Sequence, residues 1–412
     1  MKFMNIAYVI WVEGLESPII TGQVIELLKE LRRYVKEGRL YLVAFQPAYR
    51  FLLRRFALKR ANLKRVSAEL KQNNIDLSLV PVIYPGWWFF AKWHQMPLVF
   101  IQAFPVLLYF SAFRKVKLFH CRSYPVTFPA LVVKKLFGTR MIFDPRSPFP
   151  EENIVAGRWS DNSCTYKMWK RLEKKYLAGS DVTIAISKTY VEHFGKIAAD
   201  ARFAEIPNNV DLNKFVINKD FRAAFRSKMG INEDGVVFVY SGSLGNHWND
   251  PRTYAKFLIK LRELDSKHRF LFVTPDVIEL KRVFDQYGID SEEYSAMPAE
   301  LKDMPLYLSC ADFGLNFMSE PDIRMSIKTV EYLAMGLPII VNSNLLGGKE
   351  LVNQHNVGLV VDLDDLNLNE LKHFIQKKDQ QLSLKCRKVA CEKFSTEKVA
   401  RRYAEVYLSL LG

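Results

Sequence analysis

Short runs of uninterrupted apolar residues alternate with segments of helical periodicity along most of the chain. In the first half, the runs are Ile6–Val12, Leu40–Phe45, Leu118–Cys121, Met141–Phe143 and Val182–Ile186. In the second half, they are Val236–Tyr240, Phe270–Val273, Phe313–Phe317, Pro338–Val341 and Gly358–Val361. Strands that are apolar on both faces and are separated by helices form parallel sheets covered on both sides. We therefore expect an α/β protein with parallel, Rossmann-like sheets.

The length of 412 residues and one turn-rich segment predict how these strands are divided. A domain usually takes roughly 100–200 residues, so two domains fit the length. The segment from Pro207 to Asp211 is rich in turn residues and separates the two sets of runs. We expect an N-terminal domain over 1–206, a second domain over 207–394, and a C-terminal helix over 395–412 that can pack back on the first. Parallel sheets bind ligands beyond the carboxyl ends of their strands, so both domains would face a shared cleft.

The amino-terminal segment and the cysteines indicate the cellular compartment in which the protein folds. The first apolar run is short and Glu13 follows it without a cleavage site, which predicts a buried strand rather than a signal peptide. The five cysteines are scattered and form no CxxC pair, which favours a reducing compartment without disulfides or a zinc site. The longest apolar run, 97–112, has 16 residues and contains Pro105. Crossing a bilayer takes about 20 residues, so we expect this run to be too short to cross, though long enough to enter.

The segment from Arg324 to Val341 carries the clearest chemical pattern. It predicts a loop, a short helix from near Ser326 to Gly336, and a buried strand. A helix amino terminus offers backbone N–H groups to phosphate, and Arg324 and Lys328 add positive charge there. Glu331 lies more than one turn further, where a carboxylate could accept hydrogen bonds from both hydroxyls of a ribose. A surface helix of mixed charge is the alternative interpretation.

The sequence from Glu331 to Ile340 resembles the Glu-Tyr/Ala-x-Ala-x-Gly-x-Pro-hydrophobic signature of retaining GT-B glycosyltransferases of the GT4 family. Ser326 and Lys328 match a Ser/Pro-x-Lys pattern of its subgroups, and 206–211 looks like the family's Ile-Pro-Asn-Gly-Val-Asp hinge. The matches extend from about residue 180 to 362. The resemblance implies a GT-B fold and a nucleotide-sugar donor in the second domain. The implied donor-binding residues are Gly242, Ser243, Arg324, Ser326, Lys328 and Glu331.

Three positions depart from the family pattern, one of them Trp248 or Asn249, where the family usually has a lysine. Ile323 stands where many members carry the first glutamate of a Glu-x7-Glu pair, which often supports the sugar. Glu320 or Asp322 would have to replace it. Ser243 stands where the family usually has an arginine, and we expect Arg324 to supply that positive charge at the diphosphate.

The N-terminal half resembles transferases for bacterial surface polysaccharides in two segments, 119–125 and 143–147. Asp144 stands at a strand end where many relatives have a histidine. On this resemblance, the catalytic candidates Asp144 and Arg146 would face the transferred sugar, the first receiving a sugar hydroxyl or orienting the acceptor and the second holding phosphate. The alternative is an Asp144–Arg146 pair that only orders the loop. For His120, a lone histidine at the end of an apolar strand, catalytic and structural roles are both open.

The positive charge of the chain is concentrated in its first half. Residues 1–205 hold 32 Lys and Arg against 16 Asp and Glu, and the remainder holds 27 against 28. No acidic residue occurs between Leu77 and Phe143, a stretch that contains Trp87, Trp88 and Trp93. Tryptophans beside apolar runs and lysines are typical of membrane interfaces, and anionic lipid attracts basic residues by about 1 kcal/mol each. We expect this half to bind an anionic membrane surface rather than nucleic acid, for which no motif is present. A solvated basic helix beside an ordinary core strand is the alternative.

These expectations combine into one function. The chain would be a retaining glycosyltransferase of the hexosyltransferase class, acting on a saccharide or lipid-linked acceptor in surface polysaccharide synthesis. It would be cytoplasmic and peripheral on the inner face of the plasma membrane. Neither a metal nor another cofactor is expected, and the Asp362–Asp364 segment is interpreted as a helix cap. A GT-B sugar-nucleotide epimerase and a binding protein without turnover are the alternatives.

Overall fold

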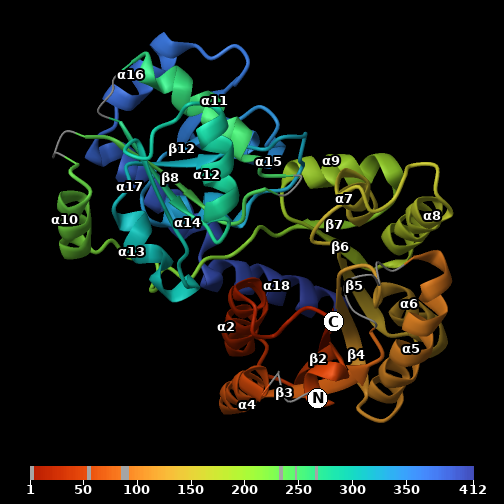
Figure 1. The fold of residues 1–412 in the computed structure, drawn as a ribbon. Helices are drawn as coiled ribbons and strands as arrows, with labels where there is room; N and C mark the ends of the chain where they lie inside the picture. Colours follow the sequence, from red (N-terminus) through yellow and green to blue (C-terminus); the bar gives the residue numbers. More distant parts are fainter. Residues whose placement is uncertain (1–3, 53–56, 85–91, 232–234, 246–247, 265–267) are drawn as a thin grey trace. The chain divides into compact units, whose positions relative to one another are not determined.

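The computed structural model describes residues 4–52, 57–84, 92–231, 235–245, 248–264 and 268–412 (Figure 1). Trp87 and Trp88, on which part of the membrane expectation rests, lie outside these residues. The chain divides into two compact units. The first unit is Met1–Pro207 with Thr396–Gly412, and the second unit is Asn208–Ser395. The division falls within one residue of the expected boundaries, and the C-terminal helix groups with the first unit.

The first unit contains a parallel seven-stranded sheet in the order β3-β2-β1-β4-β5-β6-β7. Its strands are β1 (Asn5–Trp11), β2 (Leu40–Pro47), β3 (Ile75–Val82), β4 (Val116–Arg122), β5 (Arg140–Asp144), β6 (Val182–Ala185) and β7 (Phe203–Glu205). Its helices are α1 (Pro18–Ile20), the π-helix η1 (Thr21–Ile25), α2 (Glu26–Tyr34), α3 (Tyr49–Leu52), α4 (Ala57–Gln72), the 3-10 helix η3 (Trp93–Gln95), α5 (Met96–Ala112), α6 (Thr127–Phe137), α7 (Phe149–Val155), α8 (Cys164–Gly179), α9 (Lys188–Ile197) and α18 (Thr396–Leu411).

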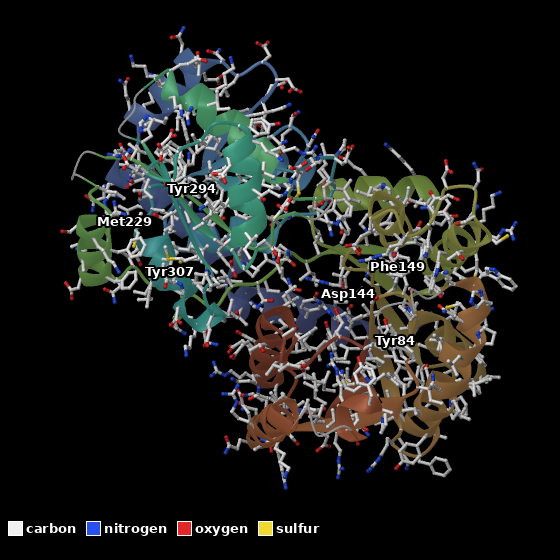
Figure 2. The ribbon with its side chains drawn as sticks, viewed as in Figure 1. Tyr84, Asp144, Phe149, Met229, Tyr294 and Tyr307 are labelled. Carbon is white, nitrogen blue, oxygen red and sulfur yellow. The ribbon has the colours of Figure 1, made fainter. Side chains whose placement is uncertain are left out.

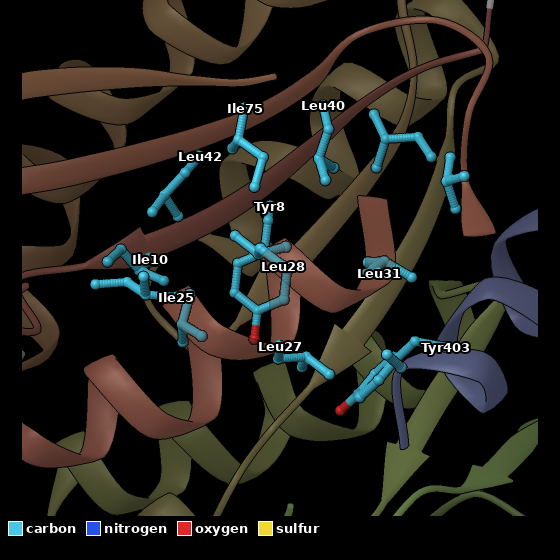
Figure 3. Close-up of a cluster of buried hydrophobic side chains, with 14 of the residues drawn as sticks. Tyr8, Ile10, Ile25, Leu27, Leu28, Leu31, Leu40, Leu42, Ile75 and Tyr403 are labelled. Atoms are coloured by element: carbon cyan, nitrogen blue, oxygen red, sulfur yellow. The ribbon is translucent and has the colours of Figure 1, made fainter. Parts of the chain in front are cut away.

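One core of the first unit joins the two ends of the chain. The apolar face of α2, with Leu28 and Leu31, packs on β1 and β2 (Figure 3). Tyr403 of α18 enters the same cluster and is 2% exposed. Because a buried tyrosine removes a large apolar surface from water, α18 is a structural part of the first unit.

The second unit contains a parallel six-stranded sheet in the order β10-β9-β8-β11-β12-β13. Its strands are β8 (Val237–Ser241), β9 (Arg269–Val273), β10 (Tyr294–Met297), β11 (Phe313–Asn316), β12 (Ile339–Asn342) and β13 (Gly358–Val361). Its helices are α10 (Lys219–Lys228), α11 (Pro251–Arg262), α12 (Val277–Gln286), the 3-10 helix η4 (Leu301–Asp303), α13 (Met304–Ser309), α14 (Ile327–Ala334), α15 (Leu346–His355), α16 (Leu368–Gln376), α17 (Gln380–Val389) and the π-helix η5 (Ala390–Phe394). Separate apolar clusters lie on the two faces of the sheet, as the continuous apolar runs predicted.

Two expectations about single segments are wrong. The Asp362–Asp364 segment does not cap a helix: Asn367 caps α16 by accepting a hydrogen bond from the Glu370 N–H, and Asp362 accepts one from the Asp364 N–H instead. The apolar run in the first unit is not too short to cross a membrane. With η3, the helix covers Trp93–Ala112, 20 residues, and by length and composition alone it is long and apolar enough to cross a membrane.

Candidate functional site

In the second unit, the loop after β8 and the amino end of α14 meet around the Lys328 amino group. Lys328 Nζ donates hydrogen bonds to Tyr240 Oη at 2.9 Å and to Asn249 Oδ1 at 3.3 Å. It also lies 4.2 Å from the centroid of the Tyr240 ring. Gly242 has a φ of 125°, and a Cβ there would lie 3.2 Å from Lys328 Nζ. Glycine therefore lets the loop backbone turn close to the lysine.

Lys328 and Glu331 lie one helical turn apart, and both are half-buried. Burial lowers the pKa of Lys328 to about 7, and the positive charge of Arg324 adds to this while Glu331 opposes it. Burial likewise raises the pKa of Glu331 to about 7, opposed by Lys328. Both groups therefore titrate near neutral pH, a property that is concentrated in ligand-binding and catalytic sites.

Arg324 is held firmly in the loop before α14. Its Nε lies 3.0 and 2.9 Å from the two carboxylate oxygens of Asp322, and its Nη2 lies 2.7 Å from Asp322 Oδ2. The guanidinium also lies 4.3 Å from the centroid of the Trp248 ring. Because Asp322 is 3% exposed and engaged by Arg324, it is poorly placed to support a sugar. Glu320, the other suggested replacement, is exposed on the same loop.

The start of α14 has the features of an anion site. Ser326 stands at the N-cap position, and its side chain makes no capping hydrogen bond. The first N–H groups of the helix therefore lack a side-chain cap, as they do where helices bind phosphate. Tyr332 Oη accepts a hydrogen bond from the Ser241 N–H at 2.8 Å, which ties α14 to the end of β8. Gly314 makes room for this, because a Cβ there would lie 2.2 Å from the Tyr332 ring.

The donor residues expected from the sequence thus share one part of the second unit. Ser243 is exposed beside Gly242, and its carbonyl accepts a hydrogen bond from Tyr240 Oη at 2.6 Å. The residue after Ser243, Leu244, donates its backbone N–H to Asp276 Oδ2 at 2.8 Å. The sequence analysis missed Tyr240 as a partner of Lys328. Its place as the fourth residue of β8, directly before the glycine loop, was the available signal.

In the first unit, the expected catalytic residues form a buried cluster. Asp144, labelled in Figure 2, ends β5 and is 0% exposed, as is His120 of β4. His120 Nε2 lies 3.3 Å from Asp144 Oδ2, and His120 Nδ1 lies 2.5 Å from Tyr407 Oη of α18. The network therefore favours a neutral imidazole that donates from Nε2 and accepts from Tyr407. These two hydrogen bonds fix the imidazole between Asp144 and Tyr407, and a catalytic role for His120 stays a prediction.

The charges around Asp144 keep it ionised. Burial alone would raise its pKa, but Arg146, the hydrogen bond from His120 and Arg122 together lower it. Burial lowers the pKa of His120, which favours its neutral form. Arg146 Nη1 lies 3.5 Å from Asp144 Oδ1, so the Asp144–Arg146 ion pair of the alternative interpretation is present in the loop after β5. Whether Arg146 in addition holds phosphate stays a prediction.

Three side chains that the sequence analysis did not single out complete this cluster. Arg122 Nε lies 2.9 Å from Glu13 Oε2, and Arg122 Nη2 donates to Gln23 Oε1 at 3.0 Å. Arg146 Nη2 donates to the same oxygen at 3.0 Å. Arg122 is about 100 residues from Gln23 and Glu13 in the sequence, and the pairing of β1 with β4 brings these segments together.

Backbone strain marks the same edge of the sheet. Val12, Ser123 and Arg146 have φ angles of 60°, 75° and 60°, in the left-handed region that non-glycine residues rarely adopt. They follow β1, β4 and β5, which are neighbours in the sheet. Such strain persists where the surrounding structure fixes a functional geometry. Among the described residues, no group of three His, Cys, Asp or Glu side chains could hold a metal ion.

No family model and no curated protein matches the sequence. Solved structures match over nearly the whole chain. A glycosyltransferase from Rickettsia africae has a TM-score of 0.70 at 14% identity, with 100% of this chain and 99% of that chain covered. HepE from Anabaena, solved with UDP, has a TM-score of 0.69 at 14% identity, with 98% and 100% covered. Sucrose-phosphate synthase from Thermosynechococcus elongatus has a TM-score of 0.70 at 14% identity, with 99% of both chains covered. Two all-parallel Rossmann-like sheets and these neighbours together show that the chain has the GT-B fold.

Proposed function

We propose that this protein is a glycosyltransferase that binds the nucleotide part of a nucleotide sugar at the start of α14. The observation that carries the proposal is the convergence of uncapped helix N–H groups, Lys328 and the Gly242 turn, with Glu331 one helical turn further. HepE, which shares the fold, was solved with UDP and with UDP-glucose. A diphosphate needs positive charge and N–H donors, and a ribose needs a hydrogen-bond acceptor. The second unit offers both.

Each residue has a role in the proposed reaction. When the bond between the anomeric carbon and the diphosphate breaks, Lys328, Arg324 and the N–H groups near Ser326 stabilise the negative charge on the leaving group. Glu331 accepts hydrogen bonds from the ribose. The acceptor hydroxyl attacks the anomeric carbon, and its proton passes to an oxygen of the departing diphosphate. The role proposed for Asp144 is to orient the acceptor. Retention of configuration and independence of metal are proposed on the resemblance to the GT4 family.

The proposed acceptor is a lipid-linked saccharide at the inner face of the plasma membrane, in the synthesis of a surface polysaccharide. This part is supported by the sequence resemblance and by the excess positive charge of residues 1–205. It is also supported by the apolar helix α5 of the first unit, which is long and apolar enough to enter a membrane.

Thermal unfolding with a panel of nucleotides and nucleotide sugars tests the donor site. One nucleoside diphosphate is expected to raise the melting temperature of the wild type. The effect should be lost or strongly reduced in Glu331→Gln, because the amide replaces a charged acceptor by a weaker one. The matched control is Glu263→Gln, an exposed glutamate after α11, which should respond like the wild type.

The result also separates the rival functions. No stabilisation by any nucleotide would contradict the donor site. Turnover of a nucleotide sugar without an acceptor would favour an epimerase. Binding without transfer to any acceptor would favour a protein that kept the fold without activity.

A further inference from the structure

Helix α5 has an apolar side that the first unit leaves uncovered. One side packs inside the unit, where Val99, Ala103 and Leu107 are 0% exposed. On the opposite side, Ile101 is 66% and Tyr109 44% exposed, and the helix contains no charged residue. A helix on the surface of a soluble protein normally presents polar and charged side chains to water there. The uncovered side of α5 therefore lacks the charged residues that a helix side exposed to water usually carries.

The same apolar character continues at the carboxyl ends of α5 and its neighbour α6, which lie side by side (Figure 1). Phe113 directly after α5 is 76% exposed, and at the end of α6 Leu136 is 62% and Phe137 46% exposed. We call these three residues, with Ile101 and Tyr109, the α5–α6 surface. Exposed apolar side chains gathered on neighbouring elements mark interaction sites more often than scattered ones do.

Positive charge lies at the same end of the two helices. Lys115 and Lys117 flank the first residue of β4, and Lys135 precedes the end of α6. All three are exposed, and no carboxylate of the described residues lies within ion-pair distance of them. The sequence has no acidic residue from Leu77 to Phe143. The apolar α5–α6 surface is thus bordered by lysines, and the sequence segment that carries it contains no acidic residue.

We propose that the α5–α6 surface binds an anionic lipid membrane, with α5 lying in the plane of the interface. Aromatic and aliphatic side chains enter the boundary between headgroups and acyl chains, and the lysines bind anionic headgroups. Crossing the bilayer is disfavoured, because it would pull Val99, Ala103 and Leu107 out of the packed interior. A second copy of the chain fits less well, because a symmetric interface would bring the same lysines together. This inference rests on the membrane part of the proposed function and not on the identity of the sugar.

Flotation of the full-length protein with vesicles tests the inference. Wild type is expected to bind vesicles of phosphatidylcholine with phosphatidylglycerol far better than vesicles of phosphatidylcholine alone. The double variant Ile101→Glu/Phe113→Glu should lose binding to both. The triple variant Lys115→Gln/Lys117→Gln/Lys135→Gln should lose on the order of 100-fold in affinity for the anionic vesicles only.

Controls in the second unit carry the same chemical changes away from the surface. Ile278→Glu replaces an exposed apolar residue (88% exposed), and Lys281→Gln/Lys372→Gln/Lys377→Gln removes three exposed lysines. Both should bind vesicles like the wild type.

Three outcomes would overturn the inference. Wild type could fail to bind anionic vesicles, or the Ile101/Phe113 variant could bind as well as the wild type. The protein could instead form a dimer in sedimentation velocity that the same variant abolishes, which would assign the surface to a second copy. Thermal shifts with nucleotide, measured on the same preparations, tell failure of this surface apart from failure of the donor site.

Discussion

At the scale of single residues, the burial of Lys328 and Glu331 disfavours folding with both side chains charged. The folded pKa of Lys328 lies well below its ordinary 10.5, so its charged form is disfavoured in the ligand-free protein. Glu331 is disfavoured as an anion in the same way, since its pKa is raised from 4.5. A bound diphosphate would give Lys328 a negatively charged partner, and a ribose would give Glu331 hydrogen-bond donors. Residues that destabilise the free protein and are satisfied by a ligand are typical of binding sites.

The two pKa values predict how donor binding depends on pH. The diphosphate of a nucleotide sugar prefers protonated Lys328, so affinity should fall as the pH rises above about 7. The ribose prefers ionised Glu331, so affinity should also fall as the pH drops below about 7. Calorimetric titration of wild type should therefore give a bell-shaped profile with limbs of at most about tenfold per pH unit.

Variants separate the two limbs of this profile. Lys328→Met should bind more weakly and keep only the decline at low pH, and Glu331→Gln should keep only the decline at high pH. A profile in wild type that is flat between pH 6 and pH 8, or one that neither variant changes, would contradict the assignment. Nucleotide sugars suit the experiment because their diphosphate carries no group that titrates between pH 6 and pH 8.

The two candidate clusters, one in each unit, differed in how far the sequence predicted them. Lys328 and Glu331 lie three residues apart on one helix, so their proximity follows from local periodicity. His120 and Tyr407 are 287 residues apart and meet only because α18 returns to the first unit. No local pattern contains that contact. The burial of His120 against α18 could not be predicted for the same reason.

At the scale of elements, one buried carboxylate fastens α10 to β11. Asp312 Oδ1 lies 2.8 Å from Arg222 Nη2, and Asp312 Oδ2 lies 3.0 Å from Arg226 Nη1. Lys378 after α16 is a third cation on the same carboxylate. Burial raises the pKa of Asp312, but these cations outweigh it and lower the pKa from 3.8 to about 2. The group therefore favours folding in its ionised form.

This shift predicts acid sensitivity of the second unit. The stabilisation by Asp312 is fully present above pH 3.8 and is lost as the pH falls from 3.8 to about 2. Asp312→Asn should lower the free energy of unfolding by on the order of 2–4 kcal/mol at neutral pH, because it leaves buried cations without their partner. Urea unfolding at pH 7 and at low pH measures both effects. Asp364→Asn, whose side chain is 86% exposed beside Lys256, is the matched control and should change stability little. An equal effect of the two substitutions would contradict this account.

The strands that the sequence did not predict share one property. Continuous apolar runs identified the strands inside both sheets, but β3, β7 and β10 were missed, and all three are edge strands. The residues of β10 are all half-buried, and β3 has exposed or half-buried residues between its buried ends. An edge strand needs less apolar sequence because one side has no neighbouring strand. Apolar runs therefore predict the centre of a parallel sheet better than its edges.

At the scale of the whole molecule, the chain builds the core of its first unit from a discontinuous sequence. The core of the first unit takes Val399, Tyr403 and Tyr407 from the last helix, and the two cores of the second unit take none of them. The last helix thus belongs energetically to the first unit, although it follows the second in the sequence. The excess of positive charge also lies in the first unit, so membrane binding and nucleotide binding are proposed for different units.

This separation predicts that the units respond differently to one substitution in α18. Tyr403→Ala should destabilise the first unit by on the order of 3–5 kcal/mol, because it leaves a cavity in that core. Differential scanning calorimetry with and without the stabilising nucleotide distinguishes the units, since only the second should respond to nucleotide. The transition that nucleotide does not shift should move to lower temperature in Tyr403→Ala, while the shifted one stays in place. Arg401→Ala on the exposed side of the same helix should leave both transitions unchanged. A single transition that Tyr403→Ala lowers and nucleotide raises would mean that the two units unfold together, and the helix would then stabilise the whole molecule.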